Sequence, residues 1–371
     1  MALPARVKTR ICMISDTHTN VPLPADDKEH AFRDPLPKAD VLLHAGDLTK
    51  VGYSIEYEAT VSMLKAADAE LKLVIAGNHD ITLDEEHFTT FGYKRHRKPI
   101  RLGVAPPVLE NDEQTLMQTI RTGAVPPTED MKAYVRRVKD LWTNQSARDA
   151  GIRYLEEGVH SFILSNGAKL TVYASPYQPE FCSWAFGYPR SEDRYNPPVP
   201  GTNSVPPANP VPDHPNIDIM LTHGPPAGIL DLVGTGQVID RHGTATDTHV
   251  GCTHLLRAAE RARPRIYLFG HIHEGWGAVR GMWDTLADGG VKQEPIATNE
   301  KEMLENRGVF YDMTSESGEK PLEFGKETLF VNASICTLSY RPKNAPWVVD
   351  LDLPLAGTDD QTRELAQDKT E

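Results

Sequence analysis

Five short apolar segments of this chain each lead directly into aspartate, histidine or asparagine, and this recurrence constrains the fold more than any other feature. Apolar runs of about four to six residues bounded by Gly, Pro or Asp are typical of buried β-strands. Because ligand sites assemble at the carboxyl ends of strands in open α/β sheets, we expect these polar residues to meet at one edge. The five strand ends read Ser15-Asp16-Thr17-His18, His44-Ala45-Gly46-Asp47, Gly77-Asn78-His79-Asp80, Thr222-His223-Gly224 and Gly270-His271-Ile272-His273.

Helical segments lie between the strand-like segments, and this alternation predicts an α/β fold with layered sheets. The expected helices are Ser54 to Ala69, Met131 to Tyr154 and His254 to Arg263. The expected strands cover residues 10–14, 40–43, 71–75, 170–173, 217–221, 265–269, 328–331 and 347–351.

The length allows more than one domain organisation. At roughly 150 residues per domain, a chain of 371 residues can form one large domain or two of ordinary size. We expect one domain over residues 7–355, followed by a polar, acidic tail over residues 356–371. Three polar stretches without a clear period are expected to be insertions in this domain, at about 99–127, 187–215 and 281–325.

Composition and cysteine use exclude several classes of protein. No segment approaches the roughly 18 consecutive apolar residues of a membrane-spanning helix, and the net charge of −13 argues against a duplex nucleic-acid binder. Cys12, Cys182, Cys252 and Cys336 form no C-x-x-C pair, which suits thiols in a reducing compartment. The N-terminus lacks an apolar export segment. We therefore expect a cytoplasmic protein that binds neither duplex nucleic acid nor membranes.

The side chains at the strand ends have the chemistry of a metal centre. They supply carboxylate oxygens and imidazole nitrogens without a thiolate, a set that favours Mn, Fe or Zn over softer metals. Two ions about 3.5–4 Å apart need a bridging group, which a carboxylate such as Asp47 can provide, and such a pair can activate a water for attack on phosphorus. The candidate ligands by this argument are Asp16, His18, Asp47, His223, His271 and His273.

The order of these motifs resembles that of the calcineurin-like metallophosphoesterases. Their pattern is D-x-H, G-D, G-N-H-[DE], H and G-H-x-H, and the five strand ends above contain all of it in order. Further stretches are similar to the MPPED (metallophosphoesterase domain-containing) branch. The resemblance runs from about Ile11 to Leu353, and these further stretches are Leu42–Asp47, Thr222–Pro226, Phe269–Gly275 and Val331–Ser334.

The resemblance implies a four-layer α/β/β/α sandwich with a di-metal site and assigns a role to each residue. Asp47 would bridge the two ions, and a water activated by the metals would be the nucleophile. His79 would lie beside the scissile phosphate as a catalytic group, and Asp80 would orient His79 by accepting its other N–H. The first metal would be held by Asp16, His18 and His273, and the second by Asn78, His223 and His271.

The expected function is that of a di-metal phosphodiesterase acting on small substrates such as cyclic nucleotides. A phosphomonoesterase or a protein phosphatase remains an alternative, and so does a slow or inactive scaffold that binds a nucleotide or a partner. The substrate contacts are open. Phe181, Trp184 and Phe186 could stack a nucleobase or could pack their loop onto the sheet. Gly46, Gly77 and Gly270 are expected to serve the turns that follow the strands.

Overall fold

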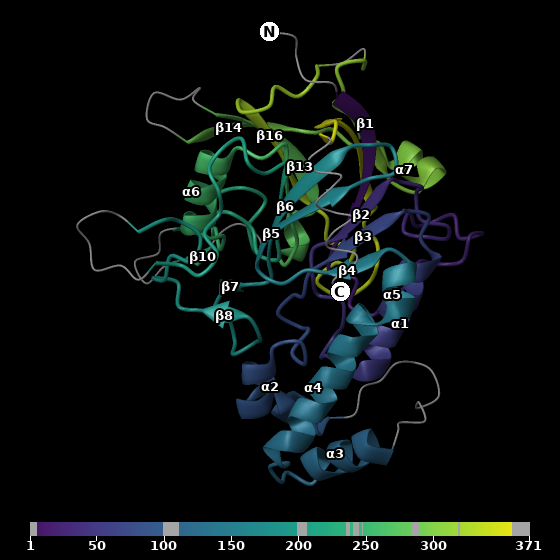
Figure 1. The fold of residues 1–371 in the computed structure, drawn as a ribbon, viewed down its shortest axis with the longest axis vertical. Coiled ribbons are helices and arrows are strands. Elements are labelled where there is room, and N and C mark those ends of the chain that lie inside the picture. The colour runs from purple at the N-terminus through teal and green to yellow at the C-terminus, as the bar shows by residue number, and fades with distance from the viewer. Residues whose placement is uncertain are drawn as a thin grey trace.

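Two mixed β-sheets lie at the centre of the computed structural model (Figure 1). It describes residues 6–98, 111–198, 206–234, 238–239, 245–246, 248–283, 290–317 and 320–357. Within these residues the first sheet has the spatial order β15 (Val309–Asp312), β17 (Trp347–Pro354), β1 (Arg6–Ile14), β2 (Val41–His44), β3 (Leu71–Val74) and β4 (Ile152–Tyr154). The second has the order β14 (Val291–Pro295), β13 (Gly277–Trp283), β16 (Glu327–Asn332), β12 (Ile266–Phe269), β9 (Ile219–Thr222), β6 (Lys169–Ser175) and β5 (Gly158–Ile163).

Helices and short strands complete the described structure. The α-helices are α1 (Ser54–Ala66), α2 (Glu85–Thr90), α3 (Asn111–Arg121), α4 (Thr128–Thr143), α5 (Gln145–Asp149), α6 (Thr253–Ala262) and α7 (Glu300–Asn306). Two short 3₁₀ segments are η1 (Gly92–Arg97) and η2 (His273–Gly275). The short strand pairs are β7 (Gln178–Pro179) with β8 (Gly187–Tyr188), and β10 (Val238–Ile239) with β11 (Ala245–Thr246).

Successive side chains of the central strands point to opposite faces of their sheet, and this alternation produces three apolar layers. In β1, Ile11 and Met13 face the second sheet, whereas Cys12 faces the helices on the outer side. In β12, Leu268 faces the first sheet and Tyr267 faces α6. Because side chains alternate between the two faces of a strand, continuous apolar runs are needed where both faces are buried.

Amphipathic helices cover both outer faces, so the predicted four-layer α/β/β/α sandwich is confirmed (Figure 1). On the first sheet, α4 buries apolar residues at positions that lie on one helix face, namely Met131, Tyr134, Val135, Val138 and Trp142. On the second sheet, α6 buries Leu255, Ala258, Ala259 and Ala262.

The parallel core strands bring their carboxyl ends to one edge. β1, β2 and β3 are parallel to one another, and so are β9 and β12. Backbone hydrogen bonds join the two sheets there, because Ser15 N–H donates to the carbonyl of Ala333 at 2.9 Å and an isolated bridge pairs Ser15 with Ser334. The segments that follow these strands therefore face one another across the sandwich.

The expected helix from Met131 to Tyr154 is too long. α4 ends at Thr143, and Asn144 begins the separate helix α5 by accepting a hydrogen bond from the N–H of Ala147 at 2.9 Å. Gly151 then adopts a φ of +77°, which turns the chain into β4. The other expected helices correspond to α1 and α6.

The stretches expected to be insertions carry regular structure. Residues 99–110 of the first lie outside the described residues, but its second part forms α3, which buries Leu116, Met117 and Ile120. The stretch 281–325 supplies β14 and β15, the outermost strands of the two sheets, together with α7. Residues 199–205 of the stretch 187–215, and residues 358–371 of the expected tail, also lie outside the described residues.

Among the described residues, no helix combines the length and the apolar character needed to cross a membrane.

A buried ion pair joins β13 to β16. The side chains of Arg280 and Glu327 are 3% and 5% exposed, and the guanidinium donates to the carboxylate. Burial alone would raise the pKa of Glu327, but hydrogen bonds, above all from Arg280, lower the pKa below its ordinary value. Such a carboxylate contributes stability above its unfolded pKa, and the contribution is lost as pH falls through the folded pKa.

Arg280→Met should therefore lower the free energy of unfolding at pH 7 by about 3 kcal/mol, because it leaves Glu327 buried without its main partner. The difference in the free energy of unfolding between wild type and variant should become smaller as pH falls below about 4.5. Denaturant unfolding at several pH values measures both. Lys326→Met is the control, because Lys326 and Glu323 form an exposed pair, 75% and 57% accessible, worth less than about 1 kcal/mol. Equal losses in the two variants would contradict this account.

Candidate metal centre

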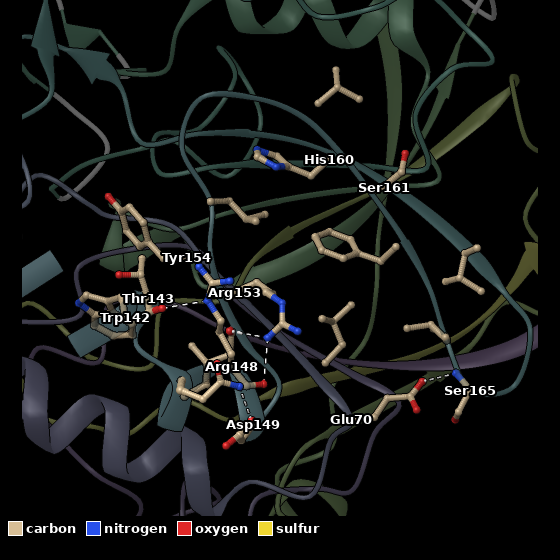
Figure 2. A pocket seen from close by; sticks show the side chains of 18 residues that line it. Glu70, Trp142, Thr143, Arg148, Asp149, Arg153, Tyr154, His160, Ser161 and Ser165 are labelled. Atoms are coloured by element: carbon tan, nitrogen blue, oxygen red, sulfur yellow. Dashed lines mark hydrogen bonds between the residues drawn. The ribbon is translucent and has the colours of Figure 1, made fainter. Parts of the chain in front are cut away.

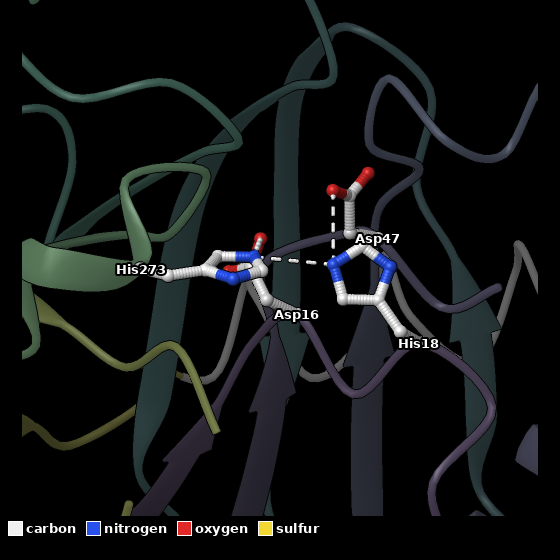
Figure 3. Close-up of side chains that lie close together, drawn as sticks. All are labelled: Asp16, His18, Asp47 and His273. Carbon is white, nitrogen blue, oxygen red and sulfur yellow. Dashed lines mark hydrogen bonds and ion pairs between the residues drawn. The ribbon is translucent and has the colours of Figure 1, made fainter. Parts of the chain in front are cut away.

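Four ligand atoms, three of them from buried residues, converge at the carboxyl ends of β1, β2 and β12. One side-chain atom from each of Asp16, His18, Asp47 and His273 lies within 4.8 Å of the others (Figure 3). His18 Nε2 is 3.5 Å from Asp47 Oδ2, and His273 Nε2 is 3.4 Å from Asp16 Oδ1. These are the three residues expected at the first metal, together with the expected bridging carboxylate.

The two histidines of this cluster direct lone pairs at each other. His18 Nδ1 lies 3.0 Å from the carbonyl of Thr49, and His273 Nδ1 lies 3.0 Å from that of Thr337. A carbonyl only accepts, so each Nδ1 carries the hydrogen and each Nε2 of the neutral ring carries a lone pair. The two Nε2 atoms are 3.1 Å apart. Only a cation or a shared proton between them makes this contact favourable.

A second donor set lies on the other side of Asp47. His223 Nε2 is 3.4 Å from Asp47 Oδ1 and 2.9 Å from Asn78 Oδ1. His223 Nδ1 lies 2.9 Å from the carbonyl of Ala45, so here too Nε2 carries a lone pair that faces acceptor oxygens. The ring of His271 lies beside that of His223, with 5.0 Å between centroids. The structure thus brings Asn78 and His271 beside His223, which faces Asp47 Oδ1. That oxygen also accepts a hydrogen bond from the backbone N–H of His79 at 2.8 Å.

The charges of the cluster also fit cations. Asp16 is fully buried and Asp47 is 2% exposed. In the described part of the chain, no lysine or arginine forms an ion pair with either carboxylate. Burial, followed by repulsion from Asp16, raises the pKa of Asp47 well above its ordinary value. Buried carboxylates are stable when they are paired or coordinate metals, and oxygen and imidazole donors suit Mn, Fe or Zn.

Hydrogen bonds from the second sheet hold Asp16 in place. The backbone N–H of His271 donates to both carboxylate oxygens at 3.0 Å, and the hydroxyl of Ser334 donates to Oδ2 at 2.8 Å. Asn332 Oδ1 accepts from the backbone N–H of Ser334 at 3.1 Å. Ser334 was not among the expected site residues, although it belongs to the stretch Val331–Ser334 that is similar to the MPPED branch.

The backbone is strained at the ligands themselves. Four of them have positive φ, a conformation that is uncommon for residues other than glycine and that collects at functional sites. The values are +51° at Asp16, +44° at His18, +52° at Asp47 and +66° at His271.

Of the three neighbouring glycines, Gly46 serves the turn as expected, whereas Gly77 and Gly270 have a different reason. Gly46 has a φ of +94°, as a sharp turn requires, but Gly77 and Gly270 do not have positive φ. A Cβ at Gly77 would lie 2.4 Å from Asp47 Oδ1, and a Cβ at Gly270 would lie 2.0 Å from Asp16 Oδ2. These two positions have no room for a side chain. Besides the carboxylates, the backbone nitrogen of Asp47 would lie 2.2 Å from the Cβ at position 77, and Ser15 Oγ would lie 2.1 Å from the Cβ at position 270.

His79 lies beside the first donor set. Its ring centroid is 4.7 Å from that of His18, and its Nδ1 is 2.7 Å from the carbonyl of Lys50. Burial lowers its pKa to about 4. The ring also stacks on Trp184 and meets the edge of Tyr340, neither of which the motif pattern contains.

The predicted contact between Asp80 and His79 is wrong. The Lys50 carbonyl accepts the N–H that Asp80 was expected to accept. Asp80 instead accepts from backbone N–H groups, of Leu48 at 3.1 Å and of Gly77 at 2.8 Å, and from Thr49. Its carboxylate therefore holds together the two loops that carry Asp47 and His79, and acts on the site through the backbone.

A large cavity in the described part of the chain lies away from this cluster. It measures about 950 Å³, opens between the edge strands β4 and β5, and is lined by residues such as Glu70, Arg153 and His160 (Figure 2). None of the predicted ligands lines it. We place the site by its chemistry rather than by cavity size, because the cluster at the strand ends joins two buried carboxylates to several imidazoles that face one another.

Gly270→Ala should abolish or strongly reduce metal binding at the first donor set, because its methyl group would displace the Asp16 carboxylate. Metal content after loading with Mn²⁺, measured by mass spectrometry, tests this. Gly290→Ala is the control. Unlike Gly270, Gly290 has positive φ (+91°), which strains an alanine, but no atom lies within 4 Å of the added carbon. Full metal content in folded Gly270→Ala would contradict the assignment.

Comparison with known proteins agrees with this geometry. A human protein named "Metallophosphoesterase domain-containing protein 1" is 29% identical over 350 residues, which are 93% of this chain and 72% of that protein, and its mouse counterpart matches equally. Among solved structures, a purple acid phosphatase from yellow lupin seeds is 10% identical over 89% of this chain and 45% of that one, with a TM-score of 0.33, and we draw nothing from this weak likeness. The family model described as "Calcineurin-like phosphoesterase" matches residues 9–199, more than half of the chain. The chain therefore belongs to the calcineurin-like phosphoesterase family, which implies hydrolysis of phosphoric esters.

Proposed function

We propose that this protein hydrolyses small phosphodiesters, such as cyclic nucleotides, at a centre that holds two divalent cations. The observation that carries the proposal is the position of Asp47, whose two oxygens face two separate sets of donors. One carboxylate shared in this way is the arrangement that a bridged pair of ions needs.

Each side chain at the site would have its own role in the reaction. When bound, the two cations would activate a water as nucleophile and offset the charge of the phosphate. Asp16, His18 and His273 would hold one ion, and Asn78 and the two other histidines the second. Residues 77–80 place His79 beside the first set, where its Nε2 can meet a phosphate oxygen or the leaving oxygen. Because Nδ1 donates to Lys50, Nε2 donates to the substrate only when the ring is a cation.

The preference for a small diester has two supports. The motif stretches are similar to the MPPED branch, which favours small phosphodiesters over phosphoproteins. In addition, Tyr340 and Leu338, which lie close in sequence and are 43% and 64% exposed, offer apolar contact area beside the metal centre, where the ring of Tyr340 lies 4.6 Å from that of His18. An aromatic or sugar group esterified to the phosphate would find a matching surface there.

Metal identity and compartment belong to the same proposal. The donor set accepts Mn, Fe or Zn, and availability in the cell selects among them. All four cysteines are free, and Cys12 and Cys336 are buried. Free cysteines suit the reducing cytoplasm, where we propose that the protein works.

Hydrolysis of an aryl phosphodiester should exceed hydrolysis of the matching monoester in purified protein with added Mn²⁺. A chelator should abolish both activities, because the donors alone cannot activate water. Steady-state rates for the two esters make the comparison. A preference for the monoester would favour the phosphomonoesterase alternative, and no turnover in protein shown to hold two metals would favour the binding scaffold.

His79→Ala should lower kcat by about 10²–10⁴-fold, the usual loss for a general acid, without changing metal content. The matched control is His160→Ala, because His160 lies on β5, where its Nε2 bonds to the carbonyl of Glu156 and its side chain lines the cavity that none of the predicted ligands lines. Rates and metal content are measured in the same preparations. If His79→Ala retains the activity of the control, the role proposed for His79 is wrong.

A further inference from the structure

A single hydrogen bond fixes the His79 ring through its own polar atoms. Nδ1 donates to the Lys50 carbonyl at 2.7 Å, and among the described residues Nε2 has no protein partner. One hydrogen bond sets a direction but leaves the imidazole free to swing about the N–H···O axis. A group that must meet a scissile bond needs its ring plane fixed as well.

Trp184 supplies contact over the face of this ring. The centroids of the His79 and Trp184 rings are 4.0 Å apart, and the planes differ by 25°, so the rings are stacked. The guanidinium carbon of Arg95 lies 3.3 Å from the Trp184 centroid. A cation over an aromatic face attracts the ring electrostatically. Imidazole, indole and guanidinium thus form consecutive layers of one stack.

Arg95 is itself held against the loop that carries Trp184. Its guanidinium donates to the carbonyls of Cys182 at 2.9 Å and Ser183 at 3.3 Å. Both of these residues have positive φ, +53° and +54°. Such strained backbone persists where the surroundings determine it strongly.

The same loop is joined to the turn that carries His79. The backbone N–H of Ala185 donates to the carbonyl of Asn78 at 3.3 Å. The N–H of Phe186 donates to Asp84 Oδ2 at 2.9 Å, and the other oxygen of Asp84 caps α2. The loop is therefore attached to the residues on both sides of His79 in the sequence.

We propose that Trp184, backed by Arg95, is a positioning residue that fixes the ring plane of His79 for contact with the substrate. This inference rests on the function proposed above and adds to it the means by which His79 is oriented. The inference also favours a structural role for the loop of residues 181–186. The ring of His79 and the guanidinium of Arg95 cover the faces of Trp184, so Trp184 cannot stack on a nucleobase. Phe186 is 7% exposed and packs into the core, and Phe181 is 60% exposed.

The plainer reading is that Trp184 only packs its loop onto the apolar core, which it also contacts. The two readings differ in what happens when His79 is absent. A residue that acts through His79 loses its effect on catalysis once His79 is removed, whereas a packing residue keeps its effect.

Trp184→Leu should lower kcat for the phosphodiester by about 10–100-fold, since displacement by about 1 Å can cost that much, while KM and metal content change little. Trp184→Phe should restore most of the rate, and Arg95→Met should show a smaller loss than Trp184→Leu. Phe181→Leu in the same loop is the control and should match wild type. In the His79→Ala background, Trp184→Leu should have no further effect.

An NMR measurement does not depend on turnover. In protein loaded with diamagnetic Zn²⁺, the imidazole N–H signal identified by its loss in His79→Ala should be present in wild type and in Trp184→Phe, and lost or broadened in Trp184→Leu. An unchanged signal in Trp184→Leu, or additive losses of kcat in the double variant, would overturn the inference. If the signal behaves as expected but His79→Ala retains full activity, the proposed role of His79 fails and the positioning of its ring stands.

Discussion

The structure of the site depends on burying two carboxylates, Asp16 and Asp47, with which no lysine or arginine of the described residues forms an ion pair. Burial of a charge is costly unless it is paired or binds a metal. Imidazole Nε2 atoms surround the carboxylates, and backbone carbonyls take up the Nδ1 hydrogens of His18, His223 and His273. The folded chain therefore collects lone pairs and negative charge at one edge, an arrangement that divalent cations stabilise. The positive φ values and the missing Cβ atoms at Gly77 and Gly270 are the local cost of this geometry.

The layered fold could be predicted from sequence because its central strands are buried on both faces. Continuous apolar runs such as residues 11–14 and 266–269 are typical of strands that are buried on both faces. The outermost strands leave no such pattern. β14 is mostly exposed, and β15 buries only Val309 and has an apolar run of just three residues, 309–311, so both strands were taken as parts of an insertion. Edge strands form because a neighbouring strand offers hydrogen bonds, which is a property of the fold rather than of the segment.

The candidate ligands could be named from sequence because each lies directly after a buried strand, and parallel strands end together. Contacts made by backbone carbonyls could not be predicted from sequence, because every residue type carries the same carbonyl. This is why Asp80 was paired with His79, when the Lys50 carbonyl from another loop takes that position. Trp184 was visible as an aromatic residue in a loop, but its stacking on His79 depends on how that loop folds back through Ala185 and Arg95. Long-range contacts of this kind follow from the tertiary structure.

The most direct test of the account is the anomalous diffraction of crystals loaded with Mn²⁺. We predict two peaks about 3.5–4 Å apart, one among Asp16, His18 and His273 and the other beside His223, with Asp47 between them. With ions in place, the Nε2 atoms of His18 and His273 should coordinate the same ion. A single peak remote from Asp47, or no peak at saturating Mn²⁺, would contradict the claim that Asp47 bridges two metals.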